Sequence, residues 1–276
     1  GGEGDDLLFG GDGADELVGG AGDDDFGAGF GDDLLIIDAD DRTQLQFGGV
    51  GFDTLRVDDA ETNGAHIHSV DIEVVYGGVG NDFINVYEQD VAVTLHGGDG
   101  DDRVYGGVTI ALQRYGADAG GTLSGGDGND LIGGGAGADT LFGDDGQDWL
   151  NGGDGDDRLY GGAGIDWLNG AKGADTLYGG EGIDQAIGGA DAELFVFNDA
   201  GGQFIIRDFE DGGDLLDVTA LGLTSTADFF NILDTGIGGG AAAIVIDTPG
   251  FADIQLLGVN AADLDEMDAA IDTEMD

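Results

Sequence analysis

Aspartates recur at every ninth position through the middle of this sequence, and carboxylates at a fixed spacing can hold hard cations. Seven consecutive nonapeptides run from Gly125 to Ile187, and the sixth residue of each is an aspartate. Four more nonapeptides open the chain between Gly1 and Ile36. Ca²⁺ takes several oxygen ligands, which carboxylates and backbone carbonyls can supply together. The spacing therefore predicts multiple Ca²⁺ sites.

The residues around each aspartate indicate a tight turn followed by a short strand. The first six positions hold three glycines and the aspartate, which suits a turn with positive φ angles. The eighth position is apolar and its neighbours are mixed, as a strand with one buried face requires. Stacking such strands joins the apolar residues into one core, as in a solenoid. The expected core residues are Leu8, Leu17, Phe26, Leu35, Ile132, Leu141, Leu150, Leu159, Leu168 and Leu177.

Two nonapeptides make one coil, so every second turn lies on the same edge and the strands form two parallel sheets. Carboxylates stacked at the strand spacing of about 4.8 Å would repel one another unless a cation lay between them. The expected rows in the regular block are Asp130, Asp148, Asp166 and Asp184 on one edge, and Asp139, Asp157 and Asp175 on the other.

An alternative gives the aspartates no metal. Aspartate can stabilise a turn by accepting local backbone hydrogen bonds. Asparagine would serve that role equally well, yet the sixth residue is an aspartate in every complete repeat, which favours the cation. Ala28, Asp144 and Ala171 replace consensus glycines and predict strained or weaker sites.

The repeat resembles the RTX (hemolysin-type) calcium-binding nonapeptide G-G-x-G-x-D-x-U-x, in which U is apolar. GGDGNDLIG at Gly125 and GGDGDDRLY at Gly152 carry the resemblance. It implies an all-β fold, a right-handed parallel β-roll with one Ca²⁺ between neighbouring turns of each edge. The expected Ca²⁺ ligands are Asp6, Asp15, Asp24, Asp33, Asp53, Asp82, Asp102, Asp130, Asp139, Asp148, Asp157, Asp166, Asp175 and Asp184.

Between residues 37 and 124 the rhythm is interrupted, but turns survive at Gly48, Gly77 and Gly97. Each step between successive turns from Ala28 to Gly125 is longer than one coil, and we interpret it as one coil plus an insertion. One edge would then be unbroken. Its predicted row is Asp15, Asp33, Asp53, Asp82, Asp102, Asp130, Asp148, Asp166 and Asp184.

The other edge is expected to carry calcium-free loops over this stretch. The loops would lie around residues 58–69, 86–91 and 108–119, and the strands at 72–76, 91–95 and 108–112. The alternative is two separate rolls joined by an unrelated β region.

His66 and His68 would share one strand face, and we interpret them as surface residues rather than a soft-metal site, because no cysteine or third histidine is near.

The region after residue 190 has fewer glycines and is expected to cap the roll. Asp208, Phe209, Asp214 and Asp217 resemble the motif that follows the last repeat in serralysin-type proteases and other type I secreted proteins. The resemblance implies the type I secretion machinery as a partner, although a cap with no export role fits the same residues. The acidic stretch Ala261 to Asp276 is predicted to be helical and, by resemblance, to carry the export signal.

We expect four regions. They are an N-terminal roll (1–36), a continuation with loop insertions (37–124), the regular roll (125–190) and the capping and secretion region (191–276).

A formal net charge of −52 opposes a compact state until counter-ions bind, so folding is expected to wait for calcium outside the cell. The absence of cysteine fits a secreted bacterial protein stabilised by metal. Seven scattered Lys and Arg residues are too few to indicate a nucleic-acid or anionic-membrane surface, and no apolar stretch is long enough to span a membrane. No catalytic motif is recognisable, so we expect no enzyme activity.

These observations leave two functions open. The first is an extracellular structural or adhesive protein of a surface layer, biofilm or filament, with self-association or a cell-surface polysaccharide as its contact. The alternative is the folding and secretion module of an RTX enzyme or toxin, such as a protease, lipase or epimerase. The chain begins inside a repeat, at Gly1, and we therefore expect it to be part of a longer protein.

Overall fold

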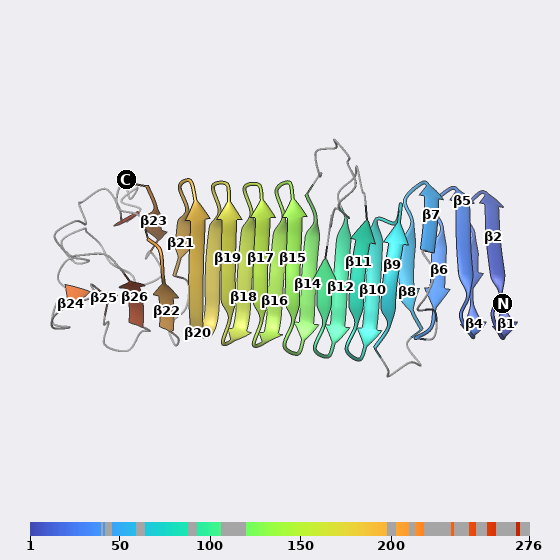
Figure 1. Ribbon diagram of the computed structural model, residues 1–276, viewed down its shortest axis with the longest axis horizontal. Coiled ribbons are helices and arrows are strands. Elements are labelled where there is room, and N and C mark those ends of the chain that lie inside the picture. The colour runs from blue at the N-terminus through green and yellow to red at the C-terminus, as the bar shows by residue number, and fades with distance from the viewer. Residues whose placement is uncertain are drawn as a thin grey trace, which may run out of the picture. The chain divides into compact units, whose positions relative to one another are not determined.

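The structure is a computed structural model of the 276-residue chain. It describes residues 1–39, 41, 46–58, 64–87, 93–105, 120–197, 203–209, 213–217, 233–234, 243–246, 253–257 and 269–270. These residues form strands and turns, and none of them is helical. The chain divides into two compact units, Gly1–Leu141 and Phe142–Asp276. Within each unit, successive strands stack side by side as a parallel β-roll (Figure 1).

In the first unit the chain passes alternately through two sheets, and equivalent residues of successive coils pair in parallel. The first sheet contains β2 (Leu7–Asp12), β5 (Asp25–Phe30), β7 (Gln46–Val50), β9 (His66–Val70), β11 (Phe83–Tyr87), β13 (Arg103–Tyr105) and β15 (Leu131–Ala136). The second sheet contains β3 (Glu16–Val18), β6 (Leu34–Ile37), β8 (Thr54–Val57), β10 (Val74–Val79), β12 (Thr94–Asp99) and β14 (Thr122–Asp127). A short pair, β1 (Gly2–Glu3) with β4 (Gly20–Ala21), lies beside them in the first coils, and β16 (Thr140–Gly146) spans the boundary between the units.

The second unit repeats this arrangement and adds a different C-terminal part. The first sheet contains β17 (Trp149–Asp154), β19 (Trp167–Lys172), β22 (Gln203–Ile206) and β26 (Asp253–Leu257). The second sheet contains β18 (Arg158–Gly164), β21 (Leu194–Val196), β23 (Leu215–Asp217) and β27 (Ala269–Ala270). The long strand β20 (Thr176–Ala190) follows the chain through a turn and pairs with both β18 and β19. The antiparallel strands β24 (Leu233–Asp234) and β25 (Ala243–Ile246) extend β26.

One prediction for the C-terminus is wrong where it can be tested. Ala269 and Ala270 were expected in a helix, but they form β27 and pair with Leu216 and Asp217 of β23. The open edge of β23 offers unpaired backbone groups, which a strand can satisfy and a helix cannot. The remainder of the predicted helix lies outside the described residues.

The core follows the predicted eighth positions. Leu17, Leu35 and Leu55 pair in register from coil to coil of the first unit, and all three are buried. The other predicted residues are buried too, except Leu8, which is half-buried in the first coil. Three phenylalanines close the core of the second unit, because the Phe195 ring lies 6.4 Å from that of Phe204 and 6.1 Å from that of Phe209.

The interrupted region continues the roll of the first unit. Strand β7 pairs with β5 and β9, and β8 pairs with β6 and β10, so the alternative of an unrelated β region is wrong there. The predicted loop at 58–69 is also partly wrong, because residues 66–70 form β9. Ala65, Ile67 and Ser69 alternate inward and are buried, which is the period of a strand. The predicted strand at 108–112 lies outside the described residues.

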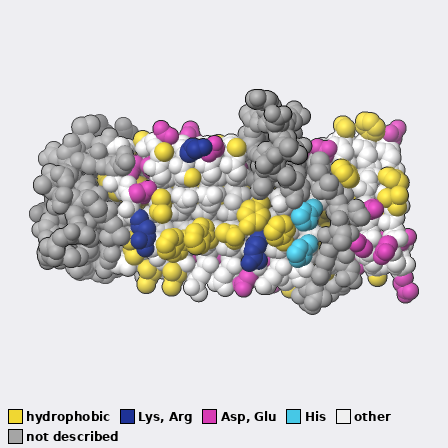
Figure 2. Space-filling view, in the orientation of Figure 1, with side chains coloured by type: hydrophobic (Ala, Val, Ile, Leu, Met, Phe, Trp, Pro, Cys, Tyr) yellow, Lys and Arg dark blue, Asp and Glu magenta, His cyan; other side chains and the backbone are white. Residues whose placement is uncertain are grey.

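Aromatic side chains stack on the outer faces. On the second sheet of the second unit the rings of Phe142 and Tyr160 lie 4.9 Å apart, and those of Tyr160 and Tyr178 lie 4.4 Å apart. On its first sheet, Trp149 stacks on Trp167 at 5.4 Å. Such cross-strand pairs stabilise the sheet register. Figure 2 shows hydrophobic side chains over the middle of the visible face and acidic side chains mainly toward its borders, where the turns lie.

Candidate calcium sites

The turns place each sixth-position aspartate against the coil that precedes it. The backbone N–H of Asp148 donates to Oδ1 of Asp166 at 2.9 Å, and the N–H of Asp157 donates to Oδ1 of Asp175 at 2.8 Å. The same bond joins Asp82 to Asp102 in the first unit. One carboxylate oxygen therefore links neighbouring coils, and the other remains available.

The second oxygen is buried and has no hydrogen-bond partner in eight of these aspartates. They lie in both units, and their side chains are buried or nearly so. A buried polar atom without a partner costs about 1–3 kcal/mol, and a charged one costs more. A bound cation would remove that cost. The eight are Asp15, Asp24, Asp33, Asp53, Asp82, Asp102, Asp166 and Asp175.

A glycine at the first position of a turn leaves the space that such a cation needs. A Cβ built on Gly10 would lie 2.8 Å from Oδ2 of Asp15 and 2.6 Å from the carbonyl oxygen of Ala28 in the next coil. A Cβ on Gly161 would meet Oδ2 of Asp166 and the carbonyl oxygen of Gly179 in the same way. Carboxylate and carbonyl oxygens thus converge beside each of these glycines. They are the ligands that Ca²⁺ prefers.

Backbone carbonyls are necessary ligands here. In the part of the chain that the structure describes, no three carboxylate or imidazole side chains converge closely enough to hold a metal alone. Sites of this kind suit a hard ion that accepts carbonyl oxygens, and they do not suit a soft metal.

Burial also raises the pKa of several of these carboxyl groups. Desolvation raises the pKa of Asp102, Asp166 and Asp175 to about 7 and that of Asp82 to about 6, although the hydrogen bond from a backbone N–H opposes the shift in each case. Neighbouring carboxylates add to the rise at Asp102, Asp166 and Asp175. Without a cation, the folded turns therefore retain protons that the unfolded chain would release.

Two carboxylate rows exist. Within the second unit they are the predicted ones, but in the first unit they differ from the prediction. We call the edge where the chain passes from the first to the second sheet edge A, and the opposite edge B. In the first unit, edge A carries Asp15, Asp33, Asp53 and Asp139, and edge B carries Asp6, Asp24, Asp82, Asp102 and Asp130. In the second unit, edge A carries Asp157 and Asp175, and edge B carries Asp148, Asp166 and Asp184.

The predicted unbroken row is therefore wrong between Asp53 and Asp82. Asp53 donates its N–H to Glu73 on edge A, whereas Asp82 accepts the N–H of Ala65 on edge B. The step from Asp53 to Asp82 is about one and a half coils rather than one coil with an insertion, because β9 adds a strand that was interpreted as a loop. A half coil moves the next turn to the opposite edge.

The rows also include four carboxylates that the repeat pattern did not indicate. Asp41 accepts the N–H of Asp24 at 2.6 Å and, through its other oxygen, that of Asp38. Glu73 accepts the N–H of Asp53 at 2.7 Å. Asp214 accepts the N–H of Glu193 at 3.2 Å, and both are buried. Of the four, only Glu193 could have been predicted from the sequence, because it follows Asp175 by the length of one regular coil.

The predicted strain at departures from glycine is confirmed at two of three positions. Asp144 and Ala171 have φ angles of 73° and 82°, which cost side-chain-bearing residues about 1–2 kcal/mol. Ala28 has no positive φ. It stands instead at the first position of the turn that ends at Asp33, where its buried methyl group fills space that glycine leaves open in other turns.

His66 and His68 share one face, as predicted, because both imidazoles stack on the Phe83 ring, at 5.7 and 5.5 Å. Desolvation and the nearby His66 lower the pKa of His68.

The described residues contain no membrane-crossing helix.

Comparison with known families agrees with the geometry of the turns. The model of the family described as "RTX calcium-binding nonapeptide repeat (4 copies)" matches residues 1–35, 71–89, 92–108, 115–150 and 151–186, more than half of the chain. The chain belongs to the RTX calcium-binding repeat family. Its turns combine an RTX sequence with buried carboxylate oxygens that lack partners, so the residues present fit the Ca²⁺ that the family implies.

Among solved structures, the solution structure of the AlgE6R3 subunit from the Azotobacter vinelandii mannuronan C5-epimerase is similar to this RTX chain. The identity is 23%, the match covers 54% of this chain and 81% of that one, and the TM-score is 0.35. No curated protein gives a match.

Proposed function

We propose that this RTX chain is an extracellular bacterial module that folds when it meets calcium after type I export, and that it serves a structural or adhesive role. The observation that carries the proposal is the set of buried aspartate oxygens without partners. In a chain with a net charge of −52, burying these groups without counter-ions raises the free energy of the folded state. The chain needs an environment that supplies counter-ions.

The two carboxylate oxygens of a turn aspartate have different roles in folding. In each turn Oδ1 of the aspartate fixes the neighbouring coil, and Oδ2 with the facing carbonyl oxygens would hold Ca²⁺. When bound, Ca²⁺ supplies the positive charge that offsets repulsion along the row. Because several ions bind only the folded chain, individually weak sites add up to a decisive stabilisation.

The extracellular assignment follows from affinity. Extracellular calcium modules have dissociation constants of about 10⁻⁴ to 10⁻³ M, far above the free calcium of a cytosol. The turns of this chain offer few carboxylates per site, which favours the weak end of that range. The chain would remain unfolded during export and become rigid outside, where a surface layer, biofilm or filament could use it.

Export itself can be tested in a bacterium that carries a type I secretion apparatus. The intact chain is expected in the medium, and deletion of residues 261–276 is expected to keep it in the cell. Deletion of the first coil, residues 1–18, is the control and should leave export unchanged. Export of the C-terminally truncated chain would contradict the secretion part of the proposal. Such a result would leave calcium-dependent folding to be judged by its own measurements.

A further inference from the structure

A turn outside the recognised repeats has the architecture of a calcium turn. Residues 188–193 read G-G-A-D-A-E and follow the turn that ends at Asp175 by one coil on edge A. Glu193 takes the aspartate position, since the residue after it, Leu194, pairs with Thr176. Asp191 takes the place of the fourth-position glycine and has a φ of 91°. The RTX family match ends before this turn, at residue 186.

The Glu193 side chain has the features of the row aspartates. It is 3% exposed, and its Oε1 is buried without a hydrogen-bond partner. A Cβ on Gly188, the first residue of the turn, would lie 2.9 Å from Oε2 of Glu193. The carboxylate therefore faces the same space in its turn that Asp15 and Asp166 face in theirs.

The next coil brings two further carboxylates to this turn. Asp214 is buried and accepts the N–H of Glu193. Asp208 accepts the N–H of Gly188 at 2.9 Å through Oδ1 and the N–H of Gly189 at 3.0 Å through Oδ2. Burial, a side-chain hydrogen bond with Asp214, and the negative charges of Asp214, Asp175 and Asp208 all raise the pKa of Glu193. Such a concentration of buried charge requires a counter-ion or a proton.

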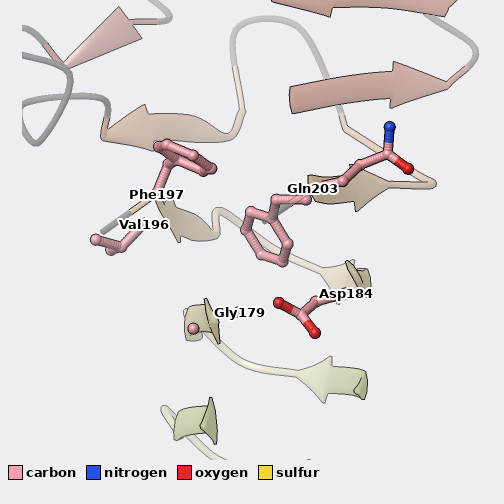
Figure 3. A pocket seen from close by; sticks show the side chains of 7 residues that line it. Gly179, Asp184, Val196, Phe197 and Gln203 are labelled. Atoms are coloured by element: carbon pink, nitrogen blue, oxygen red, sulfur yellow. The ribbon is translucent and has the colours of Figure 1, made fainter. Parts of the chain in front are cut away.

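Edge B ends differently at the corresponding coil. Phe204 pairs with Asp184 and stands where the next aspartate of the row would be. A Cβ on Gly179 would meet the Phe204 ring at 3.0 Å as well as the Asp184 carboxylate. Figure 3 shows Asp184 pointing into the pocket that Gly179, Val196 and Phe204 also line. An aromatic ring closes edge B, whereas carboxylates continue edge A.

We propose that Glu193 and Asp214, with backbone carbonyl oxygens of the 188–193 turn, form an additional divalent-cation site that takes Ca²⁺ and fastens β21 and β23 to the repeats. The inference rests on the proposed calcium-dependent folding. Glu193 immediately precedes β21 and Asp214 immediately precedes β23, so one ion at this point holds both strands. Asp208 is a positioning residue, because both of its oxygens are engaged by the turn.

The test compares Glu193→Gln with the wild-type full-length chain in Ca²⁺. Native mass spectrometry should count one Ca²⁺ fewer in the variant, and hydrogen exchange of residues 194–217 should accelerate at least tenfold at saturating Ca²⁺. Exchange of residues 149–172 should be unchanged. Glu181→Gln removes the same charge from an exposed position in the preceding turn and is the matched control.

The outcomes separate the possibilities. An unchanged ion count together with unchanged exchange in Glu193→Gln would overturn the site and show that a proton neutralises Glu193. If Glu193→Gln fails to fold at saturating Ca²⁺, Asp214→Asn takes its place and must lose the same ion for the proposal to stand. Failure of the wild-type chain to bind any Ca²⁺ would instead overturn the proposed function.

Discussion

Asp166→Asn is expected to raise the calcium concentration at the midpoint of folding about twofold, and Asp166→Ala about threefold. Asparagine can still accept the N–H of Asp148, but it removes the charge that Oδ2 offers to a cation. A site at one hundred times its dissociation constant contributes about 2.7 kcal/mol. Alanine also leaves a buried N–H without its acceptor, which costs about 1–3 kcal/mol more. Because several ions bind on folding, each loss appears as a modest shift of the midpoint.

The pair of substitutions separates a metal ligand from a turn former. If the aspartates only support turns, Asp166→Asn should fold at the wild-type calcium concentration, and that result would contradict the account. The control is Asp145→Asn, which removes a charge from an exposed position in a neighbouring turn and should leave the midpoint within experimental error. Far-UV circular dichroism follows the midpoint in all four proteins.

Acidification in the absence of metal is expected to promote folding. The folded-state pKa values of Asp102, Asp166 and Asp175 are raised to about 7 by burial, while the unfolded chain titrates near the ordinary value of 3.8. Between these values the folded chain binds more protons than the unfolded chain. Stability of the metal-free roll therefore falls as the pH rises from about 4 to about 7.

In the presence of calcium, the stability of the roll is expected to depend on pH in the opposite direction. The carboxylates must lose their protons to bind Ca²⁺, so protons compete with the ion. The calcium midpoint is expected to rise severalfold as the pH falls from 7 to 5, while the β signal in chelator alone increases over the same interval. Light scattering at each pH excludes association near the isoelectric point of about 4.1. A β signal that grows with pH in chelator would contradict the burial of these groups.

The regular repeats could be predicted from the sequence because one pattern determined both strand and turn. Position eight gave the core, as at Leu150 and Leu168, and position six gave the rows within the second unit. The coil of two nonapeptides holds there without insertions, so spacing translated directly into neighbouring positions.

The sequence could not indicate the change of edge at β9. An insertion and an extra half coil both lengthen the chain between turns, and only backbone pairing distinguishes them. Glu73 and Asp41 could not be predicted from the repeat for a related reason. Each reaches the row from an irregular connection, where the position of a carboxylate depends on the path of the chain rather than on its number in a repeat.

The alternation of edges has a physical consequence for folding. Edge A lacks carboxylates at Val93 and Gly121, and edge B lacks one at Ala65, so three turns of the middle region carry no row carboxylate. Calcium would stabilise this region less than the regular coils. We expect the middle to open first when calcium is removed.

The most direct test of calcium-dependent folding is a calcium titration of the metal-stripped chain, followed by far-UV circular dichroism at pH 7.5, with magnesium as the control. We expect little β signal in chelator and a cooperative gain near millimolar Ca²⁺ that Mg²⁺ does not reproduce. Full β structure in chelator, unchanged by added Ca²⁺, would contradict calcium-dependent folding, because the buried carboxylates would then need no cation.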